Sequence, residues 1–463
     1  MSGPTPWDSG IGKGRLARFA APLMVGSVIT HGTQFVVVAQ LGGMGESALY
    51  LRAVYAPIAF VFLALNSGLA ITLQVLAARR TGAGRAGETS RLLGSVTRVG
   101  LLAHLAVGVP VVLCARPIGA LVAVPGDERS AFAGFLLAMV LVSPVGLLGE
   151  LCAAVLRGLG RTGPSLLVNA LGAVLTVGTL ALLVEATDLG LAALPVSLAL
   201  AGAASLVVGV LLLRRQESFA ARGLRGWDRE TLPSLTAVGL PVSASFLLLF
   251  VVELVLLRVV APYGTGAVAG FSFGYTLQAL VIVPATSFGS AVAILVNQQH
   301  AAGRPEQARR TVREGAVLAF CGYTAISVLL FAAGPWAVSA MPLEQATRDE
   351  AHRFMTIVGP SFGCTALALI ALTLLEQMGR GPIAIALNLL HFTGLLSVGA
   401  WAAHATHSTT GLYVVLSVGA AVGVAGSWPV AWWLLYRVPR RPALSEGARA
   451  RVVGGHPSRG ESR

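Results

Sequence analysis

The second half of this 463-residue chain repeats the first half at one constant spacing. Pro22 and Pro241 each open an apolar segment, and they lie 219 residues apart. The same spacing separates Gly84 and Gly303, Arg129 and Arg348, Gly160 and Gly379, and Asn169 and Asn388. Self-similarity at a fixed period is the sequence signature of a duplicated structural unit. The repeat therefore predicts two copies of one fold within a single chain.

The composition places both copies in a membrane. The chain is 55% hydrophobic and only 11% charged, whereas a soluble domain carries about 25% charged residues. A helix needs about 20 mostly apolar residues to cross a bilayer. On that basis we predict an all-α integral membrane protein, with twelve transmembrane helices in two pseudo-symmetric six-helix bundles around a central cavity. The expected spans are 16–41, 49–77, 92–114, 130–156, 165–184, 189–213, 233–260, 268–297, 314–334, 351–376, 382–403 and 411–436.

These spans divide the chain into two lobes and three polar segments. Because each half holds an even number of spans, both halves have the same orientation, and the pseudo-twofold axis runs along the membrane normal. The tail is rich in Arg, Pro, Gly and Ser, which is typical of disorder. The predicted segments are an N-terminal arm at 1–15, an N-lobe at 16–213, a basic linker at 214–232, a C-lobe at 233–436 and a disordered tail at 437–463.

The net charge of +13 is distributed unevenly between the two sides of the membrane. The termini and the loops after even-numbered spans carry 26 Lys or Arg and 10 Asp or Glu. The loops after odd-numbered spans carry 5 Lys or Arg and 8 Asp or Glu. Cytoplasmic loops are enriched in Lys and Arg, so both termini are expected in the cytoplasm of a plasma-membrane protein. The charge explains topology, and we expect the lipid bilayer as a partner and no nucleic acid.

The sequence lacks the motifs of an enzyme with its own cofactor. It contains no G-x-x-x-x-G-K-[ST] phosphate loop, no H-E-x-x-H and no C-x-x-C, so we expect no ATPase, no metal site and no cofactor. The longest predicted internal connections are near 20 residues and leave no room for an extramembrane domain. Any function must lie inside the helix bundle.

One acidic residue is placed near the middle of a span. Glu253 lies about twelve residues into the span at 233–260, in LLLFVVELVLLRVV. Ionisable residues inside a membrane usually face the bundle interior and mark ion or substrate pathways. Glu253 is therefore our candidate for binding a coupling proton or cation, with a structural hydrogen bond to a neighbouring helix as the alternative.

Other polar side chains at membrane depth are candidates for lining a cavity. Thr30, His31 and Gln34 recur at helical spacing in the first span, and Gln34 is the repeat partner of Glu253. Polar groups at such positions line a water-filled cavity or join helices by hydrogen bonds, and the sequence leaves both readings open. The remaining candidates, in four other spans, are Glu150, Asn169, Phe271, Tyr275, Gln278, Asn388 and His391.

Three segments of the first half follow one another as in a known family. LARFAAPLMVGSVITHGTQFVVVAQLG, LNSGLAITLQVLAARRTGAGRAGET and LLGELCAAVLRGLGRTGPSLLVNALGAVL occur in order, and LRGLGRTGPSLLVN is the most specific piece. The chain thereby resembles the multidrug and toxic compound extrusion (MATE) family over about residues 15–436. The resemblance implies two six-helix lobes around a cavity that opens alternately to each side. It also implies export of an organic solute, amphipathic or cationic, driven by entry of protons or sodium ions.

The chain departs from that family at several positions. Many members have an aspartate where this chain has Gln34, and an asparagine and an aspartate where it has Thr176 and Leu180. Glu253 lies about one turn deeper than the carboxylate that some members carry in the seventh helix. Either coupling uses Glu253 almost alone, or this chain is an atypical member of the family. We expect a monomeric exporter of small organic solutes. A flippase for a lipid-linked precursor is the alternative, and a membrane-embedded transferase is a more distant one.

Overall fold

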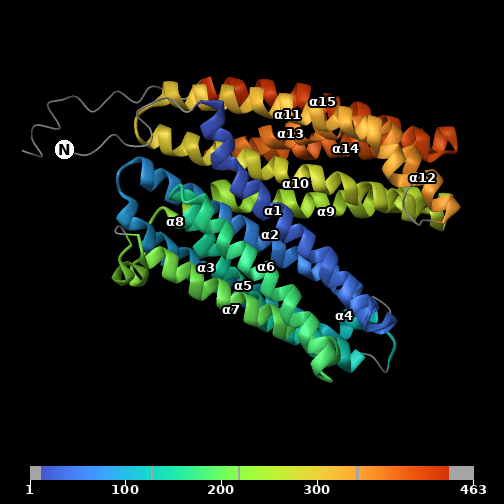
Figure 1. The fold of residues 1–463 in the computed structure, drawn as a ribbon, viewed down its shortest axis with the longest axis horizontal. Helices are drawn as coiled ribbons and strands as arrows, with labels where there is room; N and C mark the ends of the chain where they lie inside the picture. Colours follow the sequence, from blue (N-terminus) through green and yellow to red (C-terminus); the bar gives the residue numbers. More distant parts are fainter. Residues whose placement is uncertain (1–11, 122–123, 127–128, 217–218, 340–343, 437–463) are drawn as a thin grey trace, which may run out of the picture.

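The structure is a computed structural model that describes residues 12–121, 124–126, 129–216, 219–339 and 344–436. Within these ranges the chain folds into helices joined by short turns (Figure 1). The predicted tail at 437–463 and most of the predicted arm at 1–15 lie outside the described residues. The first half contains α1 (Lys13–Gly42), α2 (Glu46–Gly82), α3 (Thr89–Leu113), α4 (Ala115–Leu121), α5 (Arg129–Gly158), α6 (Thr162–Ala186) and α7 (Ala193–Arg214). The second half contains α8 (Thr231–Ser234), α9 (Leu240–Val260), α10 (Thr265–Ala301), α11 (Pro305–Ser339), α12 (Gln345–Ile357), α13 (Phe362–Leu375), α14 (Gly381–Thr406) and α15 (Thr409–Tyr436).

The prediction of twelve membrane crossings is confirmed. Eleven helical stretches among the described residues are long and apolar enough to span a bilayer. One of them, Gly359–Thr406, has 48 residues and is broken at Gly379, where φ is 80°, so that it supplies two crossings. The tenth predicted span differs in detail, because Pro360 lies in a 3₁₀ turn that separates α12 from α13. Proline lacks the N–H that a continuous helix would need there.

The duplication is visible in the backbone conformation. Four glycines described in the first half have a positive φ, a region that only glycine enters at little cost. Three of them have a glycine partner 219 residues later with nearly the same φ. The pairs are Gly45 (113°) and Gly264 (100°), Gly84 (72°) and Gly303 (73°), and Gly160 (81°) and Gly379 (80°).

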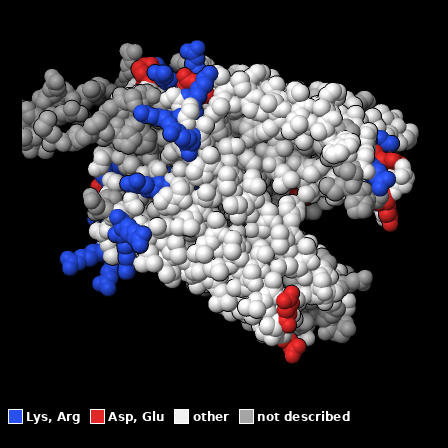
Figure 2. Space-filling model, in the orientation of Figure 1, with Lys and Arg blue, Asp and Glu red and all other residues white. Residues whose placement is uncertain are grey.

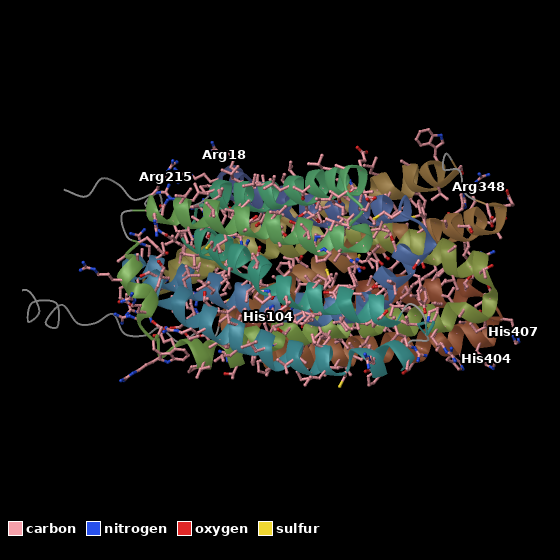
Figure 3. All side chains as sticks on the ribbon, turned by 90° about the horizontal axis from the view of Figure 1, so that it is seen from below. Arg18, His104, Arg215, Arg348, His404 and His407 are labelled. Atoms are coloured by element: carbon pink, nitrogen blue, oxygen red, sulfur yellow. The ribbon has the colours of Figure 1, made fainter. Side chains whose placement is uncertain are left out.

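The helices form two lobes that meet at one end and diverge at the other. We call α1–α7 the N-lobe and α9–α15 the C-lobe. Figure 3 shows Arg18 and Arg215 at one end of the molecule, here called the arginine-rich end. Arg348, His404 and His407 lie at the opposite end, here called the far end, and His104 lies between the two ends. In Figure 2 the surface is hollowed between the lobes at the far end, so the molecule has the shape of a V with its apex at the arginine-rich end.

The hydrophobic clusters account for this shape. One cluster joins Leu16 and Ala20 of α1 with buried residues of α10 between Ala285 and Val296. A second cluster joins Val75 of α2 with Val242 of α9 and with Val238 in the π turn directly before α9. Both clusters belong to the half of the molecule nearest the arginine-rich end. Towards the far end, the clusters around Phe132 and around Phe354 each contain residues of one lobe alone. Burial of apolar surface therefore holds the lobes together at the apex only.

Glycines let the backbones of the two lobes touch at this apex. A Cβ atom at Gly68 of α2 would collide with the carbonyl oxygen of Gly239 and the hydroxyl of Ser243. A Cβ atom at Gly82, the last residue of α2, would collide with the backbone of Gln298 in α10. Small residues at helix crossings permit close backbone packing in membranes. α2 is thus fitted against both α9 and α10.

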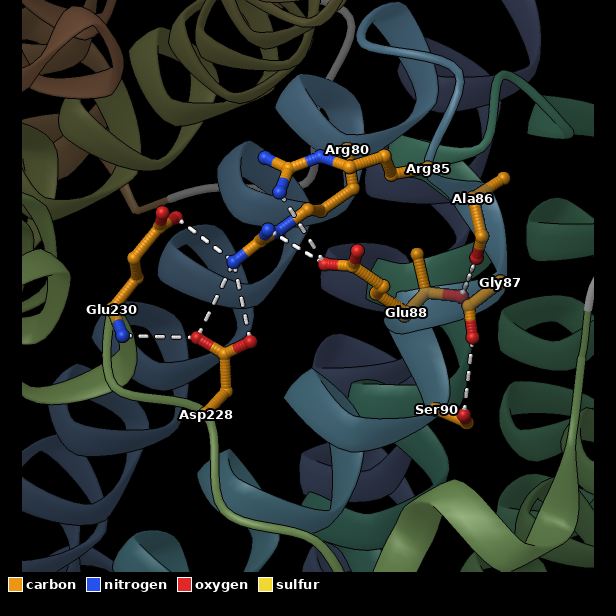
Figure 4. A network of polar contacts seen from close by, with 9 residues as sticks. Arg80, Arg85, Ala86, Gly87, Glu88, Ser90, Asp228 and Glu230 are labelled. Carbon is orange, nitrogen blue, oxygen red and sulfur yellow. Dashed lines mark hydrogen bonds and ion pairs between the residues drawn. The ribbon is translucent and has the colours of Figure 1, made fainter. Parts of the chain in front are cut away.

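The segment that connects the lobes is docked on the N-lobe (Figure 4). The guanidinium of Arg80 lies 2.6 Å from the carboxylate of Glu88, 3.2 Å from Asp228 and 3.1 Å from Glu230. The side chains of Arg80 and Asp228 are only 7% and 6% exposed. In addition, the amide of Asp228 donates to Ser95 Oγ at 2.8 Å. The second part of the predicted basic linker at 214–232 is therefore an ordered element of the N-lobe surface.

Candidate functional site

The N-lobe contains a cavity of about 200 Å³ between α1, α5, α6 and α7, with seven polar side chains among the residues of its wall. Of the four glycines in its wall, Gly146 of α5 faces open space, whereas a Cβ atom at Gly149, Gly172 or Gly202 would meet a neighbouring helix. Four residues predicted from the sequence line this cavity, and the structure brings them together from three helices. They are Thr30, Gln34, Glu150 and Asn169.

The polar groups of this cavity differ in how they are engaged. The hydroxyls of Thr30 and Thr176 donate to carbonyls of their own helices, Gly26 at 2.9 Å and Gly172 at 2.8 Å. Asn169 has no hydrogen-bond partner among the described residues. Glu150 accepts a hydrogen bond at 2.6 Å from Arg157, which lies seven residues further along the same face of α5. The cavity therefore offers a free amide and a paired carboxylate to a ligand.

Gln34 and His31 have different surroundings although both lie on α1. The side chain of Gln34 lines the cavity and accepts a 3.5 Å contact from Arg52 of α2. His31 is exposed, and its Nδ1 lies 2.9 Å from the carbonyl oxygen of Ser27 on its own helix. Arg52 is a positive charge beside the cavity that sequence reasoning did not single out. The sequence feature that could have identified Arg52 is its position as a lone arginine inside the predicted second span, six residues after Glu46.

The C-lobe contains a larger and mostly apolar cavity of about 500 Å³. It lies between α13, α14 and α15 and is lined mainly by Leu, Val and Gly residues. His391 and Ser427 are the two polar side chains on its wall. Ser427 Oγ is buried without a hydrogen-bond partner among the described residues. Of the predicted site residues, His391 is the one that lines this cavity.

The two cavities coincide only in part when the halves of the chain are compared. Val168, Gly172 and Thr176 on the wall of the N-lobe cavity are the repeat partners of Leu387, His391 and Leu395 on the wall of the C-lobe cavity. However, the N-lobe cavity is also lined by α1, whereas no residue of α9, the repeat partner of α1, lines the C-lobe cavity. Leu390 and Val422 in the wall of the C-lobe cavity are 75% and 60% exposed, so this cavity opens on the surface and is not the counterpart of the N-lobe cavity.

Glu253 lies on the face of α9 that turns towards the N-lobe. Ser243 on this face donates to the carbonyl of Ala64 in α2 at 2.8 Å, and Phe250 stacks on Phe60 with ring centroids 4.4 Å apart. Residues three apart on a helix lie on nearly the same face, so Glu253 continues this face one turn beyond Phe250. It is half-buried and has no hydrogen-bond or ion-pair partner among the described residues. The carboxylate thus stands where the two lobes begin to separate.

The aromatic candidates on α10 are placed in the packing of the C-lobe. Phe271 is fully buried and contacts Phe354 edge-on, with ring centroids 5.6 Å apart. Tyr275 stacks on Phe271 at 5.6 Å, and Gln278, one turn further, is buried as well. None of Phe271, Tyr275 and Gln278 lines either of the two cavities.

A second buried carboxylate lies close to the apex in the C-lobe. Glu376, in the π turn Glu376–Arg380, is 8% exposed, and its Oε1 accepts a 2.6 Å hydrogen bond from Ser245 of α9. Asn388 of α14 donates to the same hydroxyl at 3.2 Å. The described residues offer Glu376 no cationic partner. Glu376 is not among the candidates predicted from the sequence, although its repeat partner is Arg157, which binds Glu150 in the N-lobe.

A duplicated bundle of twelve membrane helices, with cavities in both lobes and a cleft between them, defines a membrane transporter. The model of the MatE family matches residues 22–181 and 241–402, two blocks that start 219 residues apart. The chain therefore belongs to the MatE family of transporters.

Individual relatives agree with this assignment. The chain is 21% identical to the probable multidrug resistance protein YoeA of Bacillus subtilis, over 86% of this chain and 90% of YoeA. It is 25% identical to the multidrug resistance protein PmpM of Pseudomonas aeruginosa, over 68% of each chain.

Solved structures show the same fold. The Vibrio cholerae MATE transporter VcmN in the bent form superposes with a TM-score of 0.85 at 18% identity, covering 92% of this chain and 97% of VcmN. A transporter of the MOP superfamily from Pyrococcus furiosus superposes with a TM-score of 0.83 at 16% identity, with the same coverage. At these identities the likeness establishes the arrangement of helices and not the substrate.

Proposed function

We propose that the protein is a secondary-active exporter that moves small organic solutes, amphipathic or cationic, out of the cell in exchange for H⁺ or Na⁺. The observation that carries this proposal is the asymmetric contact between the lobes. They are joined by hydrogen bonds and apolar clusters at the arginine-rich end and are separated by a cleft at the far end. Under the positive-inside rule the joined end is cytoplasmic. The conformation described here then corresponds to an outward-open state of an alternating-access cycle.

The polarity of the cavities supports this class of substrate. A polar cavity with Glu150 and a mostly apolar cavity with His391 suit molecules that combine a charged or polar group with a hydrophobic body. The relatives described above carry multidrug resistance names. These names favour export of small molecules over the flippase alternative.

Two carboxylates are candidates for coupling transport to an ion gradient. Glu253 faces the mouth of the cleft, and Glu376 is buried beside Ser245 next to the seam between the lobes. An ion that binds either group more tightly in one conformation shifts the equilibrium between the two conformations. Each charge moved through a potential of 100 mV supplies about 2.3 kcal/mol. We propose that at least one of the two groups binds the coupling ion.

The proposal is tested by reconstituting the protein in liposomes with ethidium as the transported probe. An imposed sodium or pH gradient is expected to drive accumulation of ethidium. Replacement of the coupling residue, Glu253→Gln or Glu376→Gln, is expected to reduce gradient-driven accumulation to the level of protein-free liposomes. The folded variant should still equilibrate ethidium slowly without a gradient.

Glu185→Gln is the matched control, because Glu185 is exposed at the end of α6. It should leave accumulation unchanged. If folded wild-type protein accumulates ethidium under neither gradient but moves labelled phospholipid headgroups between leaflets, the exporter proposal is wrong and the flippase alternative stands. If both glutamine variants keep full coupling, neither carboxylate binds the ion.

A further inference from the structure

A continuous chain of hydrogen bonds runs from the N-lobe cavity to the C-lobe. In the cavity wall, Glu150 accepts from Arg157 Nη2 at 2.6 Å. Arg157 Nε donates to Gln74 Oε1 at 2.7 Å. Gln74 Nε2 then donates across the seam to Ser290 Oγ at 2.8 Å and to Gln377 Oε1 at 3.1 Å. The helices α5, α2 and α10 and the π turn Glu376–Arg380 are connected in this way across the two lobes.

The chemistry of arginine fixes the direction of this chain. A guanidinium carries donors and no acceptor, so Gln74 has to present its oxygen to Arg157. The two N–H groups of the same amide then point to Ser290 and Gln377. Gln74 is 1% exposed, so no water replaces a lost partner without rearrangement. The orientation of a single amide therefore decides whether the N-lobe bonds to the C-lobe at this place.

Arg157 is held in position by the carboxylate of the cavity. Its side chain is 12% exposed, and Glu150 is its one anionic partner among the described residues. Its other contacts are Gln74 and Ser165 Oγ, at 3.4 Å. Glu150 is 35% exposed, and it is therefore accessible to a cation that enters the cavity. A cationic group that pairs with Glu150 competes directly with Arg157 for the same oxygen atoms.

The repeat shows that this connection is not required by the fold. The residues of the second half that correspond to Glu150, Arg157 and Gln74 are Leu369, Glu376 and Ala293. None of the three can make the equivalent bond, although the C-lobe folds with the same arrangement of helices. The chain of hydrogen bonds is therefore a special property of the N-lobe.

We propose that Glu150, Arg157 and Gln74 transmit the charge in the N-lobe cavity to the seam between the lobes. When a cation neutralises Glu150, Arg157 loses its anchor, the amide of Gln74 is free to turn, and the bonds to Ser290 and Gln377 are lost. The arginine-rich end then opens more readily. Gln74 and Arg157 act as positioning residues in this scheme, which rests on the proposed alternating-access function and specifies how one cavity controls it.

The test measures the separation of the lobes directly and requires no transport. In a background without the four native cysteines, spin labels are attached to Gly163→Cys at the start of α6 and Ala302→Cys at the end of α10. Both positions are exposed, and they belong to different lobes at the arginine-rich end. Pulsed electron paramagnetic resonance then gives the distribution of distances between the labels in liposomes.

Glu150→Gln, which removes the charge and keeps the shape, is expected to raise the ratio of long to short distances about fivefold or more, the usual lower range for coupling between sites. Gln74→Leu is expected to raise the ratio by a similar factor. In the Gln74→Leu background, Glu150→Gln should add no further change, because the connection is already interrupted. Glu185→Gln serves as the control and should leave the distribution unaltered.

Two results would overturn the proposal. In one, Glu150→Gln leaves the distances unchanged in the wild-type background while the protein remains folded. In the other, Glu150→Gln shifts them equally with and without Gln74, which would make Glu150 an independent contributor to packing. Because the readout is a distance, a failure of ethidium export would leave this test interpretable.

Discussion

Replacing Arg80 with alanine is expected to release the connecting segment from the N-lobe. The substitution leaves the buried carboxylate of Asp228 without its cationic partner. Breaking a buried ion pair from one side costs about 3 kcal/mol or more, which corresponds to about a 100-fold increase in local opening. Trypsin cleavage after Arg222 and Arg225 should accelerate by about that factor, as measured by limited proteolysis in detergent.

Arg85→Ala is the matched control for this experiment. Arg85 is 52% exposed and approaches Glu88 only to 3.7 Å, and exposed ion pairs contribute at most about 1 kcal/mol. Its cleavage rate should stay within a few-fold of wild type. Equal cleavage rates in the Arg80→Ala variant and in wild type would show that the segment is held by its backbone contacts alone.

Replacing Gly68 with leucine is expected to keep the lobes from closing at the apex. The Cβ atom alone would collide with the carbonyl oxygen of Gly239 and the hydroxyl of Ser243. Neither obstacle is a flexible side-chain end that can swing away, because Ser243 is itself bonded to the carbonyl of Ala64. Overpacking of this kind costs about 1–3 kcal/mol, and here the strain is relieved by separating α2 from α9.

The expected result is at least a tenfold decrease in gradient-driven ethidium accumulation, together with longer distances between labels at positions 163 and 302. Gly322→Leu provides the control, because Gly322 of α11 is exposed and a Cβ atom there would meet no neighbouring atom within 4 Å. It should transport normally. Wild-type transport by a folded Gly68→Leu variant would show that the crossing of α2 and α9 tolerates a side chain, and that closure depends on other contacts.

The helices and their duplication could be predicted because their causes are local. Apolar runs of sufficient length have to cross the membrane as helices, and the turns between them need glycine where φ is positive. Apolar runs and turn glycines can both be read directly from the sequence. Gly160 and Gly379, for example, are glycines in turns with positive φ. The break between α12 and α13 falls at Pro360, a proline that interrupts the tenth predicted span and whose effect on a helix is also local.

The candidate site was only partly accessible to sequence reasoning. Glu150 and Arg157 are seven residues apart and so share one face of α5, which sequence spacing reveals. The partners of Arg157 and Glu376, however, come from helices that are distant in the chain. Gln74, for example, is 303 residues from Gln377. Such pairs depend on how whole lobes dock, and neither periodicity nor composition encodes that arrangement.

The placement of Phe271 illustrates a related difficulty. An aromatic residue beside hydroxyl-bearing neighbours on one helix suits a binding wall and a packed interior equally well. The structure places Phe271 against Phe354, so tertiary packing determines its surroundings. Glu253 remains a prediction as a coupling residue, and its position one turn beyond Phe250 makes the experiment on Glu253→Gln informative.

The docked linker has a mechanical consequence. Since Asp228 and Glu230 are fixed to the N-lobe, the free covalent tether shrinks to α8 and the π turn Leu235–Gly239, directly before α9. Such a short tether permits rotation about a nearly stationary pivot but little sliding. α9 has 21 residues and extends about 30 Å from that pivot. A small change of angle at the π turn is therefore magnified along this lever into a large displacement at its distant tip.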